Sequence, residues 1–206
     1  MEEWEKHDFL LFDHEIGKTI SLRQVIYEKD IETLYDWMHQ KHIAPFWKLD
    51  VPKHEFKEWL KKSIASKKKD VYMGFIDGTA VSYLIVYSIK DDPIRHYYEY
   101  HEKDIGMHLL IGPREYLNKQ AGFSIIRAKL AFLFSKYDAK RIIGEPDVRN
   151  RIIVPILKKC GGKVVTMLEL PHKKAYLITG DREIFLEKME GLQRSQVKSG
   201  EQIHGN

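Results

Sequence analysis

The order of strand-like and helix-like segments predicts a mixed α/β fold, in which helices flank a central sheet. Two helical patterns come early in the chain, a run of strand patterns lies in the middle, and strands alternate with helices later. The length of 206 residues predicts one domain, or at most two small ones, with enough chain to bury a sizeable core. A hydrophobic content of 43% and an aromatic content of 12% are typical of a globular protein.

The chain begins with an extension, residues 1–18, that we expect to pack on the sheet. Its one apolar cluster, residues 9–12, is consistent with a strand or with a segment on the sheet edge. Residues 19–27 alternate apolar and polar side chains, which predicts the first strand of the main domain. Asp30 is expected to cap a helix that continues to about residue 40, because Asp is a favoured N-cap residue.

Asp77-Gly78 is a strong turn dipeptide, so residues 71–75 and 81–89 are expected to form a β-hairpin. An apolar stripe predicts a helix over roughly residues 123–136. The same reasoning predicts helices over 53–66 and 150–161, and strands over 104–111, 141–146, 163–168 and 174–179. The main domain is expected to span residues 19–188, and the polar residues 189–206 to form a disordered tail.

Charge and composition exclude several classes of protein. The net charge of +4 is modest, and Lys and Arg are spread along the chain, which argues against a nucleic-acid-binding module. The single cysteine, Cys160, excludes an intramolecular disulfide, allows a reducing compartment and is a poor candidate nucleophile. No apolar run approaches the length of a membrane span, and the acidic first residues are unlike a signal peptide. We expect a cytoplasmic protein without a membrane or nucleic-acid partner. Its oligomeric state is not predicted.

One stretch has the features of an anion-binding site. It joins the buried-looking strand over 104–111 to the helix that follows, and free backbone N–H groups at a helix N-terminus attract anions. An ordinary turn without a ligand has the same local pattern. The expected turn consists of Lys119, Gln120, Ala121, Gly122, Phe123 and Ser124.

This turn resembles motif A of the GNAT acyltransferase superfamily, whose Gln/Arg-x-x-Gly-x-Gly/Ala loop binds the pyrophosphate of acyl-coenzyme A. Lys119 stands at the basic position, Gly122 at the central glycine and Ser124 at the small residue. Asn150, followed eleven residues later by Gly161, resembles a second pattern of the superfamily. The resemblance implies a GNAT fold with a mostly antiparallel sheet, whose middle strands splay apart to admit acetyl-CoA or another acyl-CoA.

The resemblance also implies which residues contact the coenzyme. Besides the turn and Asn150, these are Leu109, Leu110 and Ile111, whose backbone N–H groups would polarise the thioester carbonyl. Seven residues after the Asn, many members of the superfamily carry a Tyr that protonates the leaving thiolate. Here that residue is Leu157, so the general mechanism does not transfer unchanged.

Three more segments resemble the siderophore-pathway acyltransferases that act on hydroxylysine or related hydroxylamines. They are Asp104-x-Gly106-x-His108, Glu145-Pro-Asp-Val-Arg-Asn150 and Leu170-Pro-His-Lys173-x-Ala175. Residues 39–47, HQKHIAPFW, are similar to an early His-and-Trp segment of the same group. The resemblance covers about residues 20–187. It implies N-acylation of a small hydroxylamine acceptor to give a hydroxamate for siderophore biosynthesis.

His108 suits the role of general base, because an imidazole titrates near neutral pH. The resemblance implies that His108 and Asp147 form the catalytic pair. The ten histidines are scattered without ligand spacing, so no metal site is expected. Phe46 and Trp47 are equally consistent with residues that plug the core. The residues implied to bind the acceptor are His39, Phe46, Trp47, Asp104, Glu145 and Lys173.

Two other functions remain open. One is a GNAT enzyme that acts on an ordinary amine, such as an aminoglycoside, a polyamine or a peptide terminus. The other is a non-catalytic subunit that binds acyl-coenzyme A and transfers nothing. Preference for a hydroxylated acceptor excludes the first, and dependence of turnover on His108 excludes the second.

Overall fold

The computed structural model describes residues 6–201, with side chains for residues 6–191. The elements follow in the order β1 (Phe9–Asp13), β2 (Lys18–Gln24), α1 (Tyr27–Met38), α2 (Ala44–Trp47), α3 (Lys53–Ile64), β3 (Lys69–Ile76), β4 (Thr79–Ser88), η1 (Ile89–Asp91), η2 (Pro93–His96), β5 (Asp104–Ile111), η3 (Arg114–Leu117), α4 (Lys119–Lys136), β6 (Arg141–Gly144), α5 (Ile153–Lys159), β7 (Lys163–Leu170), β8 (Lys173–Asp181) and α6 (Arg182–Glu201).

The strands form one eight-stranded sheet in the order β1-β2-β3-β4-β5-β6-β8-β7. Every neighbouring pair is antiparallel except β5 and β6, which are parallel. The predicted mixed α/β class, with a mostly antiparallel sheet flanked by helices, is therefore confirmed. The predicted hairpin is also confirmed: Asp77 has φ 46° and Gly78 has φ 80°, the left-handed pair that a tight turn between β3 and β4 needs.

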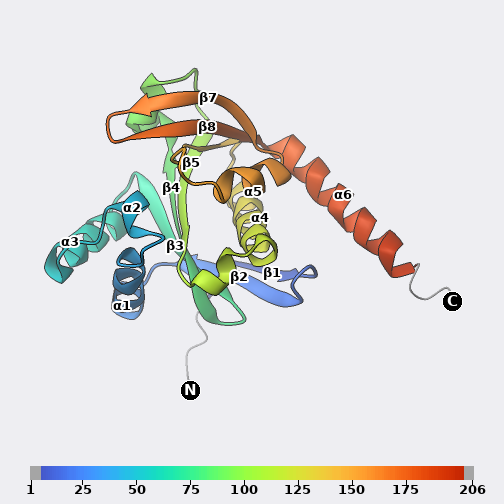
Figure 1. Cartoon of the computed structure of the whole chain (residues 1–206), viewed down its shortest axis with the longest axis horizontal. Helices are drawn as coiled ribbons and strands as arrows, with labels where there is room; N and C mark the ends of the chain where they lie inside the picture. The colour runs from blue at the N-terminus through green and yellow to red at the C-terminus, as the bar shows by residue number, and fades with distance from the viewer. Residues whose placement is uncertain (1–5, 202–206) are drawn as a thin grey trace.

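Helices cover both faces of the sheet (Figure 1). On one face α1 and α3 bury apolar residues such as Leu34 and Phe56 against β3, β4 and β5. On the other face α4 and α5 bury residues such as Ile126 and Ile156 against the same strands. Because side chains alternate between the faces of a strand, each central strand contributes to both cores. Each central strand thus presents neighbouring residues to opposite sides of the molecule.

Helix α1 begins before the predicted cap. Asp30 lies inside the helix and is 4% exposed. Its carboxylate accepts two hydrogen bonds from the Arg23 guanidinium, at 2.7 and 2.9 Å, and one from the N–H of Ile26 at 2.7 Å. The prediction that Asp30 is the N-cap was wrong, because this buried ion pair with β2 draws the carboxylate into the core.

Two further boundaries differ from the sequence prediction. Helix α4 begins at Lys119, not near residue 123, because the side chain of Asn118 caps it by accepting the N–H groups of Gln120 and Ala121. Helix α6 extends to Glu201, into the segment 189–206 that the sequence predicted to be a disordered tail; residues 189–201 contain no proline. Residues 202–206 lie outside the described residues. Figure 1 shows α6 projecting away from the sheet.

Candidate active site

Strands β5 and β6 pair over three residues only and then separate. Their register runs from Asp104 opposite Arg141 to Gly106 opposite Ile143. The N–H of Gly112 donates to Val81 of β4, and hydrogen-bonding direction alternates along a strand. The N–H groups of Leu109 and Ile111 therefore point away from β4, into the opening. This arrangement is the splayed pair of strands that the sequence predicted.

Two adjoining cavities meet at this opening. The first, which we call the apolar groove, has a volume of about 360 Å³ and lies between β5, α2 and the helices α4 and α5. The second, the polar cleft, has a volume of about 410 Å³ and lies between β5, α2 and the β7–β8 hairpin. Both cavities are lined by Phe46, Trp47, Leu109, Asn150 and Ile153. A molecule in one cavity can therefore reach a molecule in the other.

His108 lies in the polar cleft, where its ring is 40% exposed. Its Nδ1 is 3.4 Å from Oε1 of Glu145, whose carboxylate is 7% exposed. His108 lies on β5, and Glu145 directly follows β6, the other strand that flanks the opening; their side chains meet on the same face of the sheet. A buried carboxylate beside one ring nitrogen fixes the orientation of the imidazole and leaves Nε2 as the nitrogen available to a substrate. The pair therefore has the geometry of a general base and its orienting carboxylate.

Tyr87 completes this arrangement, and the sequence analysis did not identify it. Its ring stacks on His108 with centroids 5.0 Å apart, and its hydroxyl donates to Oε2 of Glu145 at 3.3 Å. Burial raises the pKa of Tyr87 well above its ordinary value, so the hydroxyl stays protonated as a donor. A Cβ at Gly106, directly across from Tyr87 in the sheet, would lie 2.3 Å from the ring. Glycine at this position of the Asp104-x-Gly106-x-His108 motif therefore makes room for the tyrosine.

Asp147 lies in the polar cleft, but its carboxylate contacts Arg149 and not His108. The guanidinium donates two hydrogen bonds, at 2.9 and 2.7 Å, and lowers the pKa of the Asp147 carboxyl. The structure thus places both predicted catalytic residues in one cleft without pairing them. The carboxylate beside His108 belongs to Glu145, which the sequence had suggested as an acceptor-binding residue.

Three other predicted acceptor-binding residues line the polar cleft. The ammonium of Lys173 donates to the carbonyl oxygen of Glu145 at 2.7 Å and lies 3.5 Å from its carboxylate. Trp47 approaches His108 edge-on, with centroids 6.5 Å apart, and the Arg149 guanidinium lies 5.7 Å above the ring of Phe46. Leu157, at the position of the superfamily's Tyr, also lines this cleft and brings no hydroxyl to it.

Two predicted acceptor-binding residues lie elsewhere. Asp104 is fully buried at the start of β5, where it accepts hydrogen bonds from Arg141 at 2.9 and 2.6 Å and from the backbone of His101. It anchors β5 to β6 below the opening and lines neither cavity. His39 is exposed at the end of α1, packs on Tyr35 and lies outside both cavities. Each residue is engaged by local contacts, and the structure does not bring either of them to the two cavities.

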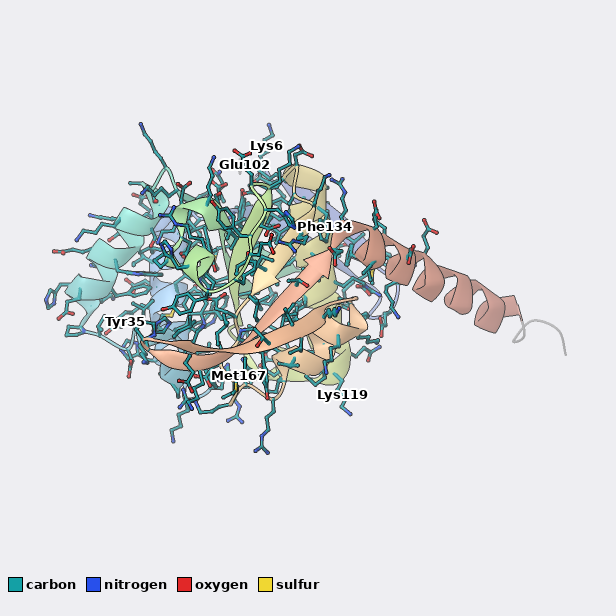
Figure 2. All side chains as sticks on the ribbon, turned by 90° about the horizontal axis from the view of Figure 1, so that it is seen from above. Lys6, Tyr35, Glu102, Lys119, Phe134 and Met167 are labelled. Atoms are coloured by element: carbon teal, nitrogen blue, oxygen red, sulfur yellow. The ribbon has the colours of Figure 1, made fainter. Side chains whose placement is uncertain are left out.

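The predicted coenzyme-binding residues divide into two groups. Leu109, Leu110, Ile111 and Gly122 line the apolar groove, and Asn150 lies where the groove joins the cleft. Phe123 and Ser124, in the second turn of α4, are fully buried and do not line the groove. Lys119 and Gln120 are exposed in the first turn of α4, next to the buried Ala121. Figure 2 shows Lys119 at the periphery of the molecule.

The apolar groove suits a coenzyme with a long, uncharged arm and a thioester. Its walls are largely aliphatic, and the unpaired edge of β5 offers the backbone N–H groups of Leu109 and Ile111. A Cβ at Gly122 would already contact Ile156 at 3.4 Å and the carbonyl oxygen of Tyr116 at 3.5 Å, so a larger residue would narrow the groove. Arg149 and Arg151 line it and supply positive charge. The residues present therefore fit acyl-coenzyme A.

Three further features concern the part of the chain that the structure describes. Among the side chains that the structure describes, those of residues 6–191, no group of three or more His, Cys, Asp or Glu residues is placed to hold a metal ion. Burial raises the pKa of the Cys160 thiol to about 12, so this thiol is protonated at neutral pH. None of the described helices combines the length and hydrophobicity that crossing a membrane would need.

Comparison with known proteins gives the family. The family model described as "Acetyltransferase (GNAT) domain" matches residues 27–170. The N-hydroxyputrescine acetyltransferase of Acinetobacter baumannii is 32% identical over 169 residues, which cover 82% of this chain and 80% of that protein. The N(6)-hydroxylysine O-acetyltransferase of Escherichia coli is 24% identical over 86% of this chain, and the match spans only 57% of that longer protein.

Solved structures agree with this assignment. An uncharacterised protein from Bacillus halodurans is 36% identical and superposes with a TM-score of 0.83 over 87% of this chain and 93% of that one. The aminoglycoside acetyltransferase AAC(6′)-Ib in complex with coenzyme A is 20% identical and shares the fold, with a TM-score of 0.72 over 82% of this chain and 98% of that one. The chain belongs to the GNAT acetyltransferase family and is an acyl-CoA N-acyltransferase.

Proposed function

We propose that this enzyme transfers an acyl group, acetyl in the simplest case, from acyl-coenzyme A to the nitrogen of a hydroxylated amine, giving a hydroxamate of the kind used in siderophores. The observation that carries this proposal is the junction of the two cavities at His108. One cavity suits the thioester and the other offers a base and polar groups to a small acceptor. Supporting it, two of the relatives named above act on N-hydroxyputrescine and N(6)-hydroxylysine.

In the proposed mechanism each residue has one task. His108 removes the proton from the acceptor nitrogen as that nitrogen attacks the thioester carbonyl. Glu145 holds the ring and stabilises the imidazolium that forms, while Tyr87 donates to Glu145. The N–H of Leu109 donates to the developing oxyanion. Coenzyme A supplies the activated acyl group and leaves as a thiolate.

Asp147 takes an acceptor-side role in this proposal. Arg149 keeps its carboxylate ionised by lowering its pKa, so it accepts a hydrogen bond from the N–OH group and not the proton of the reaction. Leu157 cannot protonate the leaving thiolate. A hydroxylamine nitrogen is less basic than an alkyl amine, so more of it is unprotonated at neutral pH and less acid–base assistance is needed. The presence of Leu157 in place of the superfamily's Tyr is therefore compatible with a hydroxylated acceptor.

The test is thiol release from acetyl-CoA with matched acceptors: N6-hydroxylysine against lysine, and N-hydroxyputrescine against putrescine. We expect turnover with at least one hydroxylated acceptor that exceeds its parent amine by tenfold or more. Equal turnover with the parent amines would make this a GNAT enzyme of ordinary amines. Binding of acetyl-CoA without release for any acceptor would instead favour the non-catalytic subunit.

A further inference from the structure

The far end of the polar cleft carries positive charge that the proposed reaction does not use. Lys69, the first residue of β3, and Lys48, which follows α2, both line this cleft. The two carboxylates of its lining already have cationic partners, because Lys173 lies against Glu145, and Arg149, which lines the apolar groove, pairs with Asp147. Among the described residues, no carboxylate oxygen lies within 4.0 Å of either Lys48 or Lys69. Lys48 and Lys69 are thus the two lysines of the described cleft lining that have no carboxylate partner.

Lys69 is the better placed of the two lysines. It is half-buried, its ammonium donates to Oγ of the buried Ser63 at 3.0 Å, and it lies 5.8 Å above the ring of Trp59. Burial lowers its pKa, as expected when an ammonium loses water without gaining an anion. Lys48 is exposed, and its ammonium donates to the carbonyl oxygen of His172 at 3.3 Å. Lys69 is therefore held in a fixed position, from which it can meet an anionic group in the cleft.

The sheet register fixes how far Lys69 lies from the base. Val71, Ile85 and His108 stand side by side on β3, β4 and β5, and Lys69 is two residues from Val71 on the same face. Two strand spacings and two residues along the strand put the Cα atoms of Lys69 and His108 about 12 Å apart. Both side chains point over the same surface, lined by Ile85. Because both residues line the polar cleft, an acceptor in this cleft can extend from one to the other.

We propose that Lys69 binds a carboxylate at the remote end of the acceptor, so that the enzyme selects an N-hydroxylated amino acid over an N-hydroxylated diamine. This inference rests on the proposed function and refines its acceptor. Six bonds separate the hydroxylated nitrogen of N6-hydroxylysine from its carboxyl carbon, a reach of roughly 7 Å when extended. A diamine of similar length would bring its second ammonium to Lys69 and be repelled.

The test compares N6-hydroxylysine with N-hydroxycadaverine, which differ only in the carboxylate. We expect the wild type to prefer N6-hydroxylysine in kcat/KM by about tenfold or more. Lys69→Met should raise KM for N6-hydroxylysine at least about tenfold, change KM for N-hydroxycadaverine much less, and keep kcat. Lys69→Arg, which retains the charge, should recover most of the loss. Lys68→Met, an exposed neighbour, is the matched control.

Other outcomes overturn the proposal. It fails if the wild type prefers N-hydroxycadaverine, or if Lys69→Met affects both acceptors equally. It also fails if the variant changes KM only for succinyl-CoA, because the carboxylate would then belong to the donor. If only unhydroxylated amines react, the proposed function fails, while the ratio of lysine to cadaverine still tests Lys69. If nothing reacts, calorimetric binding of N6-hydroxylysine to wild type and Lys69→Met in the presence of coenzyme A decides.

Discussion

The carboxylate of Glu145 contacts His108, Tyr87 and Lys173. We expect Glu145→Gln to lower kcat by roughly tenfold to a hundredfold, because a neutral amide cannot stabilise the imidazolium. KM for acetyl-CoA should stay near the wild-type value, since Glu145 does not line the apolar groove. Steady-state kinetics measures both constants. Glu169→Gln, an exposed carboxylate on β7, is the control.

If Glu145→Gln kept full kcat while Asp147→Asn lost it, the roles of the two carboxylates would be the reverse of those proposed. The bidentate contact of Asp147 with Arg149 would then have to open when substrate binds. Comparing the two variants in parallel therefore decides which carboxylate works with His108.

Gly106 gives a second prediction for single residues. Gly106→Ala should displace the Tyr87 ring, because the new Cβ would lie 2.3 Å from it. We expect kcat to fall by roughly tenfold or more through misplacement of His108, and the free energy of unfolding to fall by about 1–3 kcal/mol. Gly180→Ala, whose Cβ would meet only the carbonyl oxygen of Ile142 at 3.8 Å, should change neither. Undiminished kcat in Gly106→Ala would show that Tyr87 does not position the histidine.

Sequence motifs located the residues of the cleft better than they located the contacts between them. His108, Glu145 and Lys173 were all identified from short motifs, and all lie in the polar cleft. Asp104 belongs to the same motif as His108 but lies four residues away along a strand, with Arg141 as its partner. Tyr87 was missed because its segment matches no motif. Its position opposite Gly106 depends on the register between β4 and β5, which a single sequence does not give.

Helix α4 carries a lysine that its amphipathic pattern does not explain. Lys129 is 1% exposed, and its ammonium lies close enough to Gly74 of β3 that a Cβ there would be 2.9 Å away. Burial lowers its pKa from 10.5 to about 7. Between pH 7 and 10.5 the unfolded chain therefore binds more protons than the folded chain. The free energy of unfolding rises with pH across this window and falls as the pH is lowered through it.

We expect Lys129→Met to raise the free energy of unfolding near pH 7 by about 2–4 kcal/mol, because it removes the cost of a buried ammonium. The wild type should gain stability as pH rises from 7 towards 10, and the variant should lose most of this slope. Urea denaturation at several pH values measures both effects. Lys62→Met, an exposed substitution on α3, should follow the wild type. If the free energy of unfolding of Lys129→Met depended on pH as steeply as that of the wild type, Lys129 would not be the source of this pH dependence.

At the level of elements, alternating patterns predicted most strands, and the termini of helices were harder to predict. The start of α4 depends on Asn118, whose side-chain cap lets the helix begin at Lys119, four residues earlier than the apolar stripe indicated. The same cap occupies two N–H groups that the sequence had suggested for an anion. The polar composition of residues 189–201 suggested disorder, although helix propensity there is high and α6 continues through them.

For the molecule as a whole, the sheet separates the two substrates and brings them together at one point. Leu109 and Ile111 face α4 and the apolar groove, while the preceding residue, His108, faces α2 and the polar cleft. This follows from the alternation of side chains along β5 and from the early end of its pairing with β6. The family resemblance predicted the opening. The division of the cavity into an apolar and a polar side needed the structure.

The central claim is that His108, at the junction of the two cavities, promotes acyl transfer to a hydroxylated nitrogen. The most direct measurement is a single-turnover reaction of acetyl-CoA with N6-hydroxylysine, with the hydroxamate product detected as its ferric complex, for wild type and His108→Gln. We predict hydroxamate formation by the wild type, a loss of roughly a hundredfold or more in the variant, and acetyl-CoA affinity unchanged within about twofold. Hydroxamate formation at the wild-type rate by His108→Gln would contradict the account.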